Sequence, residues 1–153
     1  MLPIPTKFNL VAGSSEGSTL LNAFDGALLD AGAGNLNLLR VSSVLPPSAV
    51  YDEYLLIPPG SLVPTAYGAI DSNTPETIIS AAVGVGIPGD GSFGMIMEVS
   101  GEFDKNAAEK QVRKMLAEAF EMRNKTLAEI KVKVAEHKVD KTGCAFAGVL
   151  LWY

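Results

Sequence analysis

Short apolar runs that are typical of β-strands recur along the chain. They cover residues 8–13, 36–45, 66–70, 93–100, 129–139 and 144–153. The run at 129–139 alternates apolar and polar residues, which predicts a strand with one solvated face. Residues 77–87 are also apolar, but they fit either one strand or a short helix followed by a strand. A chain with this pattern is expected to be built mainly from sheets.

Two segments carry helical periodicity instead. The first follows Ser18 and Thr19, either of which can cap it, and its apolar side chains are Leu20, Leu21, Phe24, Leu28 and Leu29. The second covers residues 105–125 after the capping residue Asp104, and its apolar face holds Ala107, Ala108, Val112, Met115, Leu116 and Phe120. The segment 48–64, rich in proline and tyrosine, is expected to be irregular. Two helices among many strands predict an α+β fold, and we expect a four-layer αββα sandwich with mostly antiparallel or mixed sheets.

Composition excludes several classes of function. The chain has 153 residues and a net charge of −5, so we expect a single domain over residues 1–153 and no binding to nucleic acid or to anionic membranes. No apolar run approaches the roughly 18 residues that span a membrane, and the first residues lack the pattern of a signal peptide. Cys144 is the single cysteine, so no intrachain disulfide forms and a cytoplasmic location is expected.

The sequence does not predict a nucleotide-binding loop, a zinc site or a nucleophilic cysteine. The segment GVGIPG at 84–89 matches the glycine pattern of a dinucleotide site, but a turn and a strand follow it in place of the required helix. His137 is the single histidine and lies among charged residues, so we expect it at the surface. One histidine and one distant cysteine make a zinc site improbable, and no metal is predicted. Cys144 lies in an apolar run, which favours a core position over a nucleophilic one.

The least ordinary feature is a pair of adjacent hydroxyls, Ser42 and Ser43, inside the apolar run 36–45. The run then ends at Pro46-Pro47. Taken alone, the pair is explained adequately by backbone hydrogen bonds near a strand end, because serine commonly bonds its own backbone. The sequence around the pair favours a chemical role.

Four segments, 10–47, 60–70, 94–101 and 136–153, closely resemble the pyruvoyl-dependent arginine decarboxylases. The resemblance runs from about residue 8 to the C-terminus, and the block NLNLLRVSSVLPP at 35–47 is its most specific part. It implies a proenzyme that cuts itself between Ser42 and Ser43 into residues 1–42 and 43–153. The Ser43 hydroxyl would attack the Ser42 carbonyl, and the resulting ester would break down to leave a covalent pyruvoyl group at residue 43.

The resemblance also implies the reaction and the assembly. The pyruvoyl group would form a Schiff base with L-arginine and release agmatine and CO₂, for polyamine synthesis or for the consumption of protons. Members of the family form trimers or pairs of trimers with active sites between subunits, so a homo-oligomer is expected.

Site residues follow from the resemblance, position by position. Glu98, the lone carboxylate of the run 93–99, corresponds to the acid that reprotonates the product, and burial there would raise its pKa. Asn37 corresponds to an amide that donates to a developing oxyanion. Asp25 corresponds to the carboxylate that grips the substrate guanidinium, and Ser42 is expected to contact the substrate.

Other interpretations remain open. By pattern alone, Glu98 fits an exposed strand position equally well, Asn37 an ordinary strand start, and Asp25 an ordinary helix charge. A pyruvoyl enzyme for aspartate, histidine or ornithine is one alternative, although an aspartate enzyme should carry a cation where Asp25 stands. An unprocessed paralogue with a structural or binding role is another, and the intact Ser43 argues against it.

Overall fold

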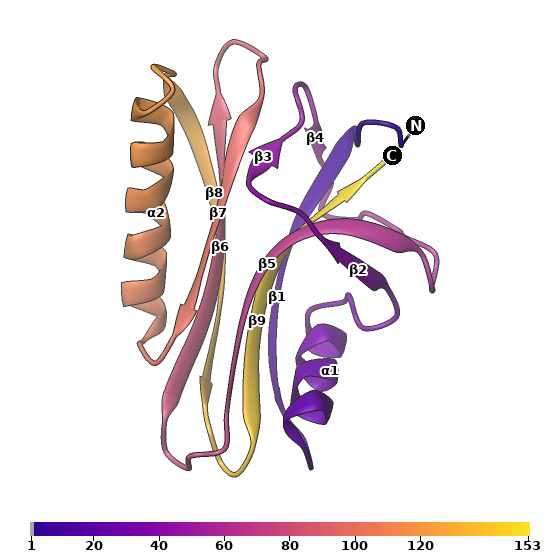
Figure 1. The fold of residues 1–153 in the computed structure, drawn as a ribbon, viewed down its shortest axis with the longest axis vertical. Helices are drawn as coiled ribbons and strands as arrows, with labels where there is room; N and C mark the ends of the chain where they lie inside the picture. Colours follow the sequence, from indigo (N-terminus) through magenta and orange to yellow (C-terminus); the bar gives the residue numbers. More distant parts are fainter. Residues whose placement is uncertain (1) are drawn as a thin grey trace.

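The computed structural model describes residues 2–153 and confirms the four layers. α1 (Leu20–Asp30) covers one sheet, the second sheet packs on the first, and α2 (Lys105–Glu121) covers the outside of the second (Figure 1). The strands are β1 (Lys7–Glu16), β2 (Asn37–Arg40), β3 (Val44–Leu45), β4 (Val50–Tyr51), β5 (Leu62–Ser72), β6 (Ile78–Pro88), β7 (Gly94–Gly101), β8 (Leu127–Lys138) and β9 (Gly143–Trp152). No helix in this described part is long and apolar enough to cross a membrane.

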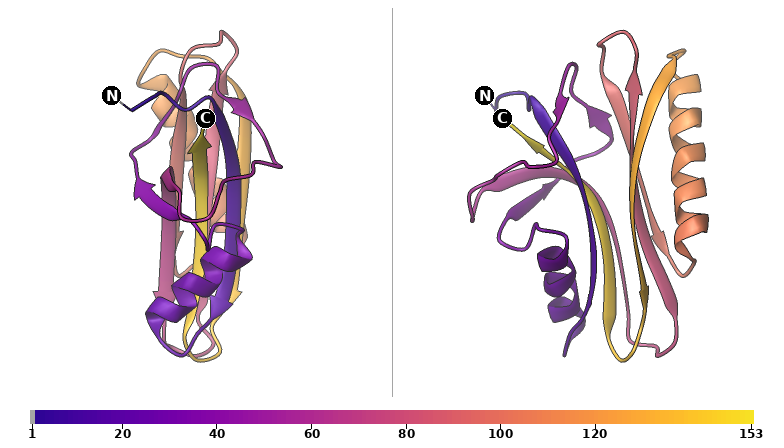
Figure 2. Two further views of the ribbon diagram at one scale, coloured as in Figure 1. Left: turned by 90° about the vertical axis from the view of Figure 1, so that its right-hand side faces the viewer. Right: turned by 180° about the vertical axis from the view of Figure 1, so that it is seen from behind.

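Hydrogen bonds between strands define two sheets. Sheet A has the order β2-β5-β9-β1-β4, and sheet B has the order β3-β7-β6-β8. The long strands pair antiparallel, whereas the short strands β2 and β4 run parallel to β5 and β1. The two sheets stand face to face over much of their length and diverge at the end where β9 finishes (Figure 2). The expected mostly antiparallel, mixed sandwich is therefore confirmed.

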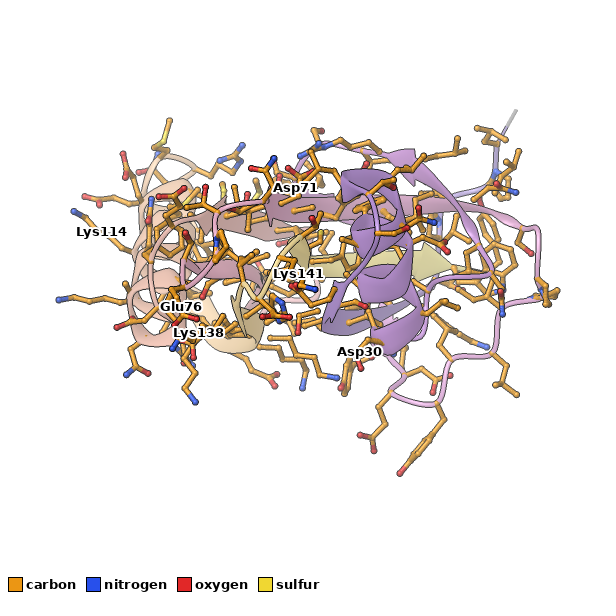
Figure 3. The ribbon with its side chains drawn as sticks, turned by 90° about the horizontal axis from the view of Figure 1, so that it is seen from below. Asp30, Asp71, Glu76, Lys114, Lys138 and Lys141 are labelled. Atoms are coloured by element: carbon orange, nitrogen blue, oxygen red, sulfur yellow. The ribbon has the colours of Figure 1, made fainter. Side chains whose placement is uncertain are left out.

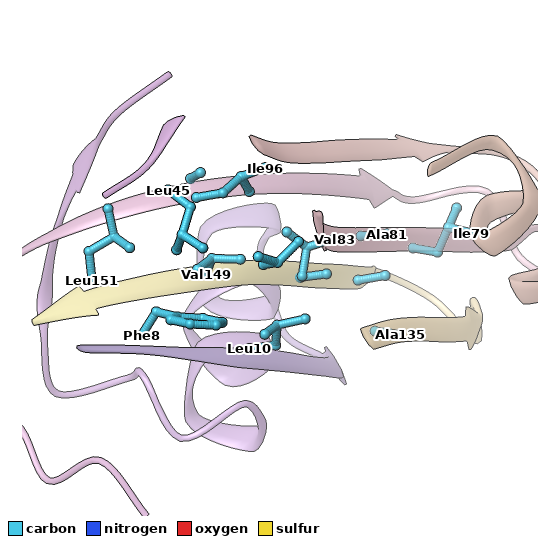
Figure 4. Packing of buried hydrophobic residues seen from close by; sticks show 14 of the residues in the cluster. Phe8, Leu10, Leu45, Ile79, Ala81, Val83, Ile96, Ala135, Val149 and Leu151 are labelled. Carbon is cyan, nitrogen blue, oxygen red and sulfur yellow. The ribbon is translucent and has the colours of Figure 1, made fainter. Parts of the chain in front are cut away.

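The space between the sheets is filled by an inter-sheet core. Phe8, Leu10 and Val149 of sheet A meet Val83 and Ile96 of sheet B, and each is at most 2% exposed (Figure 4). Full burial of a side chain of this size contributes about 1.5–3 kcal/mol. This core holds the sheets together and fixes which face of each strand points inward.

The buried face of α1 differs from the predicted one. Three leucines of the predicted stripe are exposed, namely Leu20 (40%), Leu21 (75%) and Leu29 (54%). The residues that face sheet A are Ala23, Ala27 and Leu28. The helix lies so close to β1 that a Cβ atom on Gly13 would stand 2.5 Å from the Ala27 carbonyl oxygen. So close an approach admits small side chains, and the leucines remain on the outer face.

The glycines that mimic a nucleotide motif have a packing role. Gly84 and Gly86 lie in β6 on the face that α2 covers. A Cβ atom on Gly84 would collide with the Val112 side chain, and one on Gly86 would stand 2.7 Å from the Phe120 ring. β6 continues through a turn into β7, so no helix N-terminus follows these glycines.

Several element boundaries differ from the expected ones. α2 ends at Glu121 and not at residue 125, and Asn124 then turns the chain with a φ of 50°. The strand expected at 66–70 is the 11-residue β5. The segment 77–87 is the single strand β6, without a helix. The segment 48–64 is not irregular throughout, because it contains β4 and the start of β5.

The apolar run 36–45 is not one strand. It divides into β2 in sheet A and β3 in sheet B, and Val41, Ser42 and Ser43 carry the chain from one sheet to the other (Figure 1). We call these three residues the crossover segment. Both halves of the run are apolar and extended, so periodicity does not show the break.

A carboxylate joins the end of β1 to the β8–β9 turn. Glu16 Oε2 lies 2.6 Å from His137 Nε2, and Glu16 Oε1 accepts hydrogen bonds from the backbone N–H groups of Lys141 (2.7 Å) and Thr142 (3.0 Å). Figure 3 views this end of the molecule, with Lys141 labelled. His137, expected at the surface, is half-buried, with 18% of its side chain exposed.

We predict that Glu16→Gln destabilises the protein in a pH-dependent way. Burial alone would raise the pKa of Glu16, but the hydrogen bonds from Lys141, His137 and Thr142 outweigh it and hold the pKa below its ordinary value of 4.5. A lowered pKa stabilises the fold above the unfolded pKa, and this contribution is lost as the pH falls through the folded pKa. The thermal midpoint should drop by about 2–4 °C at neutral pH, for a loss of about 1 kcal/mol.

The measurement is the thermal midpoint of wild type and variant across pH. The difference should shrink towards zero below the folded pKa of Glu16, and Glu53→Gln, in an exposed loop, should show no such trend. A Glu16→Gln effect that is equal at all pH values would contradict the ionic role.

Candidate active site

The crossover segment is fixed at both ends by backbone hydrogen bonds to different sheets. The Val41 N–H donates to the Thr65 carbonyl of sheet A over 3.1 Å, and the Ser43 carbonyl accepts from the Ile96 N–H of sheet B over 2.7 Å. The peptide bond between Ser42 and Ser43 lies between these two anchors. It therefore spans the boundary between the sheets.

The backbone of Ser43 lies beside β7, directly before β3. β3 pairs with β7 so that Leu45 lies opposite Gly94, and the hydrogen bond from Ile96 places Ser43 opposite that residue. Leu45 of β3 is buried in the inter-sheet core, whereas Ser43 forms a bend that directly precedes β3. Ser43 itself is partly exposed, and the hydrogen bond from the Ile96 N–H fixes its backbone next to β7.

Glu98 lies two residues beyond Ile96 on β7, on the same inward face. Diagonal neighbours in an antiparallel pair are about 7–8 Å apart, which sets Glu98 near Ser43. Glu98 Cβ and Cγ would lie 3.6 Å from a Cβ atom on Gly68 of β5, so the side chain stands between the sheets. Burial raises the pKa of Glu98, as its apolar strand predicted, and the charge of Arg40 opposes this rise in part.

Ser42 borders a largely apolar pocket of about 250 Å³. The wall of this pocket includes Val44, Pro3, Pro5 and Tyr153, so residues from both terminal segments of the described chain lie beside Ser42. Figure 1 shows the start of β1 and the end of β9 side by side in sheet A. The pocket gives the Ser42 side of the peptide bond a partly open, apolar surrounding, which sequence spacing does not reveal.

The chain turns away directly after β3. Pro46 has no N–H for a strand ladder, the Ala49 N–H donates to the Pro46 carbonyl over 3.3 Å, and Ser48 has a φ of 59°. In residues 2–153 the non-glycine residues with a left-handed backbone are Ser48, Glu76 and Asn124. The serine pair is therefore held by its two anchors and not by a left-handed backbone.

Arg40, a lone charge in the apolar run 36–45, is a further neighbour of the site. Its Nη2 donates to the Tyr67 carbonyl over 2.8 Å, and its guanidinium carbon lies 4.6 Å from the centre of the Tyr67 ring. The Tyr67 carbonyl adjoins Gly68, over which Glu98 packs. Glu98, a predicted site residue, is the single charge in its apolar strand. Arg40 carries the same signal in the run 36–45 but is not among the predicted site residues.

Asn37 and Asp25 lie apart from the serine pair within one chain. Asn37 begins β2, roughly 10 Å before its end, and its Nδ2 donates to the Gly60 carbonyl over 2.9 Å. Asp25 is exposed on α1, which covers the outer face of sheet A, whereas Ser43 lies at the inner face. Among the described residues Asp25 has no ion-pair partner within 4 Å, so the expected cationic partner is not found in the chain itself.

Two other chemistries find no support in the described part of the chain. Cys144 is buried in the core, and this burial, with a smaller effect from Asp71, raises the pKa of its thiol to about 12, which leaves the thiol unreactive. No group of three or more His, Cys, Asp or Glu side chains within residues 2–153 is arranged to hold a metal ion. The structure therefore brings together Ser42, Ser43 and Glu98.

Comparison with known proteins gives one answer over nearly the whole chain. A family model described as pyruvoyl-dependent arginine decarboxylase matches residues 7–153. Proteins of that name from Methanocaldococcus jannaschii, Thermococcus sibiricus and Methanococcus maripaludis are 54%, 47% and 45% identical to it. The matches cover 98%, 96% and 97% of this chain and 92%, 95% and 92% of the relatives. The chain belongs to the family of pyruvoyl-dependent arginine decarboxylases.

Proposed function

We propose that the chain cuts its own Ser42–Ser43 peptide bond and that the pyruvoyl group formed at residue 43 converts L-arginine to agmatine and CO₂ through a Schiff base. The observation that carries this proposal is the crossover segment, whose two anchors hold the serine pair between the sheets beside Glu98. Family membership supports the pyruvoyl group and arginine. The products of the cut, residues 1–42 and 43–153, remain together as one protomer.

Self-cleavage requires the chain and one water molecule. Ser43 Oγ adds to the Ser42 carbonyl carbon, the peptide C–N bond breaks, and an ester replaces the amide. Loss of the Ser43 α-proton then expels Ser42 as a carboxylate and leaves a dehydroalanine with a free amine. Its imine tautomer takes up water and loses ammonia, which leaves the pyruvoyl group. The anchors help the first step, because they hold the hydroxyl and the carbonyl in a restricted geometry.

The surroundings of residue 43 fit a pyruvoyl group. The reaction leaves the carbonyl of residue 43 intact, so the Ile96 N–H that bonds it at 2.7 Å can bond the same oxygen after the cut. Once formed, the group supplies an electrophilic ketone and an electron sink for decarboxylation. A backbone donor on that oxygen would stabilise negative charge there.

Glu98 is the proposed proton donor to the carbon that CO₂ leaves. It shares the inward face of β7 with Ile96, opposite Ser43. Because burial raises its pKa, a larger fraction of Glu98 is protonated near neutrality than of an exposed glutamate.

Asn37 and Asp25 are proposed to act in the site of a neighbouring protomer, within a trimer or a pair of trimers. Leu21 and Leu29 lie one helical turn on either side of Asp25, and both are exposed. A carboxylate between two exposed leucines suits a contact that buries Asp25 beside a substrate guanidinium. Ser42, which becomes a chain end after the cut, is the proposed substrate contact on its own protomer.

The alternatives are less well supported. An aspartate decarboxylase would need a cation for the substrate side chain, and Asp25 is an acid. An unprocessed structural paralogue would not need Ser43 or its anchors.

We place the protein in the cytoplasm, where a single unpaired cysteine such as Cys144 is ordinary.

Ser43→Ala should remain full length, because it lacks the attacking hydroxyl. Ser42→Ala is the matched control, and it should still cleave, since residue 42 contributes its carbonyl. The measurement is the intact mass of each purified variant. Cleavage of Ser43→Ala at the same bond would rule out attack by the Ser43 hydroxyl.

Glu98→Gln should process normally but lose decarboxylase activity by about 10²-fold or more, since proton transfer by a positioned acid contributes typically 10²–10⁴-fold. Glu102→Gln, an exposed neighbour just beyond β7, should keep full activity. The measurement is steady-state CO₂ release from arginine. Full turnover by Glu98→Gln would remove the proton-donor role.

Asp25→Asn should process and assemble normally but lose activity on arginine. Removing one partner of a buried charge pair costs about 2–5 kcal/mol, which corresponds to roughly a 30- to 5,000-fold loss in kcat/KM. The loss should be smaller on citrulline, a neutral analogue. CO₂ release from both substrates, with sedimentation to check assembly, makes the test. An equal loss on both substrates would mean that Asp25 does not bind the guanidinium.

A further inference from the structure

The backbone hydrogen bonds between β2 and β5 follow a regular series. The Asn37 N–H donates to the Ser61 carbonyl over 2.9 Å, and the Val41 N–H donates to the Thr65 carbonyl over 3.1 Å. The two strands are parallel and in register throughout β2. In a parallel ladder every second residue of one strand donates to every second residue of the other, so both numbers advance by two at each bond.

The next bond of this series is not made. It would run from the Ser43 N–H to the Tyr67 carbonyl, but Ser43 has crossed to sheet B, where its carbonyl accepts from Ile96. The Tyr67 carbonyl accepts instead from Nη2 of Arg40 over 2.8 Å. Among the described residues the Ser43 N–H has no protein acceptor.

We propose that Arg40 is a positioning residue for self-cleavage: its guanidinium occupies the place on the Tyr67 carbonyl that the Ser43 N–H would take, and so keeps the Ser42–Ser43 peptide in the crossover between the sheets. This inference rests on the proposed self-cleavage. It concerns how the peptide bond is presented and assigns Arg40 no contact with the substrate.

The physical basis is a competition for one acceptor. A backbone carbonyl that lacks a donor is costly where it is shielded from water, and Tyr67 is half-buried, so an uncapped Tyr67 carbonyl would favour continuation of β2 along β5. That continuation would draw Ser43 into sheet A and away from the Ile96 N–H. The guanidinium removes the competition because its planar fork reaches the carbonyl while the group stacks on the Tyr67 ring.

The charge of Arg40 has a second effect, which must be distinguished from its hydrogen bond to the Tyr67 carbonyl. It lowers the pKa of the nearby Glu98 against the upward effect of burial. Arg40→Lys keeps both the charge and a donor, whereas Arg40→Met removes both and keeps an unbranched apolar stem. Arg113→Met is the matched control, because Arg113 is an exposed arginine of α2 that pairs with Glu109 one helical turn away.

The first experiment measures position directly, without activity. Amide hydrogen exchange of residue 43 and Ile96 is followed in uncut Ser43→Ala protein, alone and combined with each Arg40 variant or Arg113→Met. With Arg or Lys at position 40, the Ile96 amide should be protected and the residue-43 amide unprotected. With Met, protection should move to the residue-43 amide. An unchanged pattern in Arg40→Met would overturn the proposal, and Arg40→Gln provides the same comparison if the Met variant does not fold.

The second experiment follows self-cleavage from synthesis in a cell-free system, by intact mass. Arg40→Met should cleave about five- to tenfold more slowly, the effect of one ordinary hydrogen bond. Arg40→Lys should recover most of the rate, and Arg113→Met should cleave like wild type. Wild-type speed in Arg40→Met, or equal slowing in the Lys variant, would overturn the proposal. If wild type itself does not cleave, the proposed function fails, and hydrogen exchange alone then decides the role of Arg40.

Discussion

After β2, the chain has to pass from sheet A to sheet B, and the site is organised by that passage. The inter-sheet core fixes the two sheets relative to each other. The hydrogen bonds at Val41 and Ser43 then fix the ends of the crossover segment to one sheet each. A peptide bond held in this way has little conformational freedom. Such restriction favours attack by a neighbouring hydroxyl on the amide carbonyl. The same arrangement brings Ser43 to the face of β7 that carries Glu98.

The fold also explains how a cut in the chain can leave the protomer intact. Residues 1–42 contribute β1, α1 and β2, and β1 lies inside sheet A between β9 and β4. Its pairing with β9 runs from Lys7 opposite Trp152 to Glu16 opposite Gly143. Glu16 adds contacts to His137 and the β8–β9 turn. These interactions lie far along the chain from the crossover segment, so the loss of one peptide bond there leaves them in place.

Sequence patterns predicted the architecture well because strand and helix periodicities are local properties. They failed where a residue's environment depends on distant elements. Periodicity predicts the leucines of α1 in the core, but the close approach at Gly13 selects Ala23 and Ala27 for the buried face. The run 36–45 has the pattern of one strand, since an apolar extended segment looks the same whether it stays in one sheet or changes sheets.

The site shows the same division. Ser42, Ser43 and Glu98 were predicted, and one chain brings them together. The Ile96 N–H has no side-chain signature, so sequence could not indicate it, and Arg40 gains meaning from the ladder that ends at Val41. Asn37 and Asp25 lie elsewhere on the protomer, where a role in the reaction requires a second subunit.

Self-cleavage of the Ser42–Ser43 peptide bond is the proposal on which the others depend. The most direct test is the intact mass of the freshly purified wild-type chain, without substrate or added cofactor. Self-cleavage yields two species, residues 1–42 with a free carboxylate at Ser42 and residues 43–153 lighter by one ammonia than a chain that starts with serine. A single species with the mass of the uncut chain, unchanged on prolonged incubation of the folded protein, would contradict it.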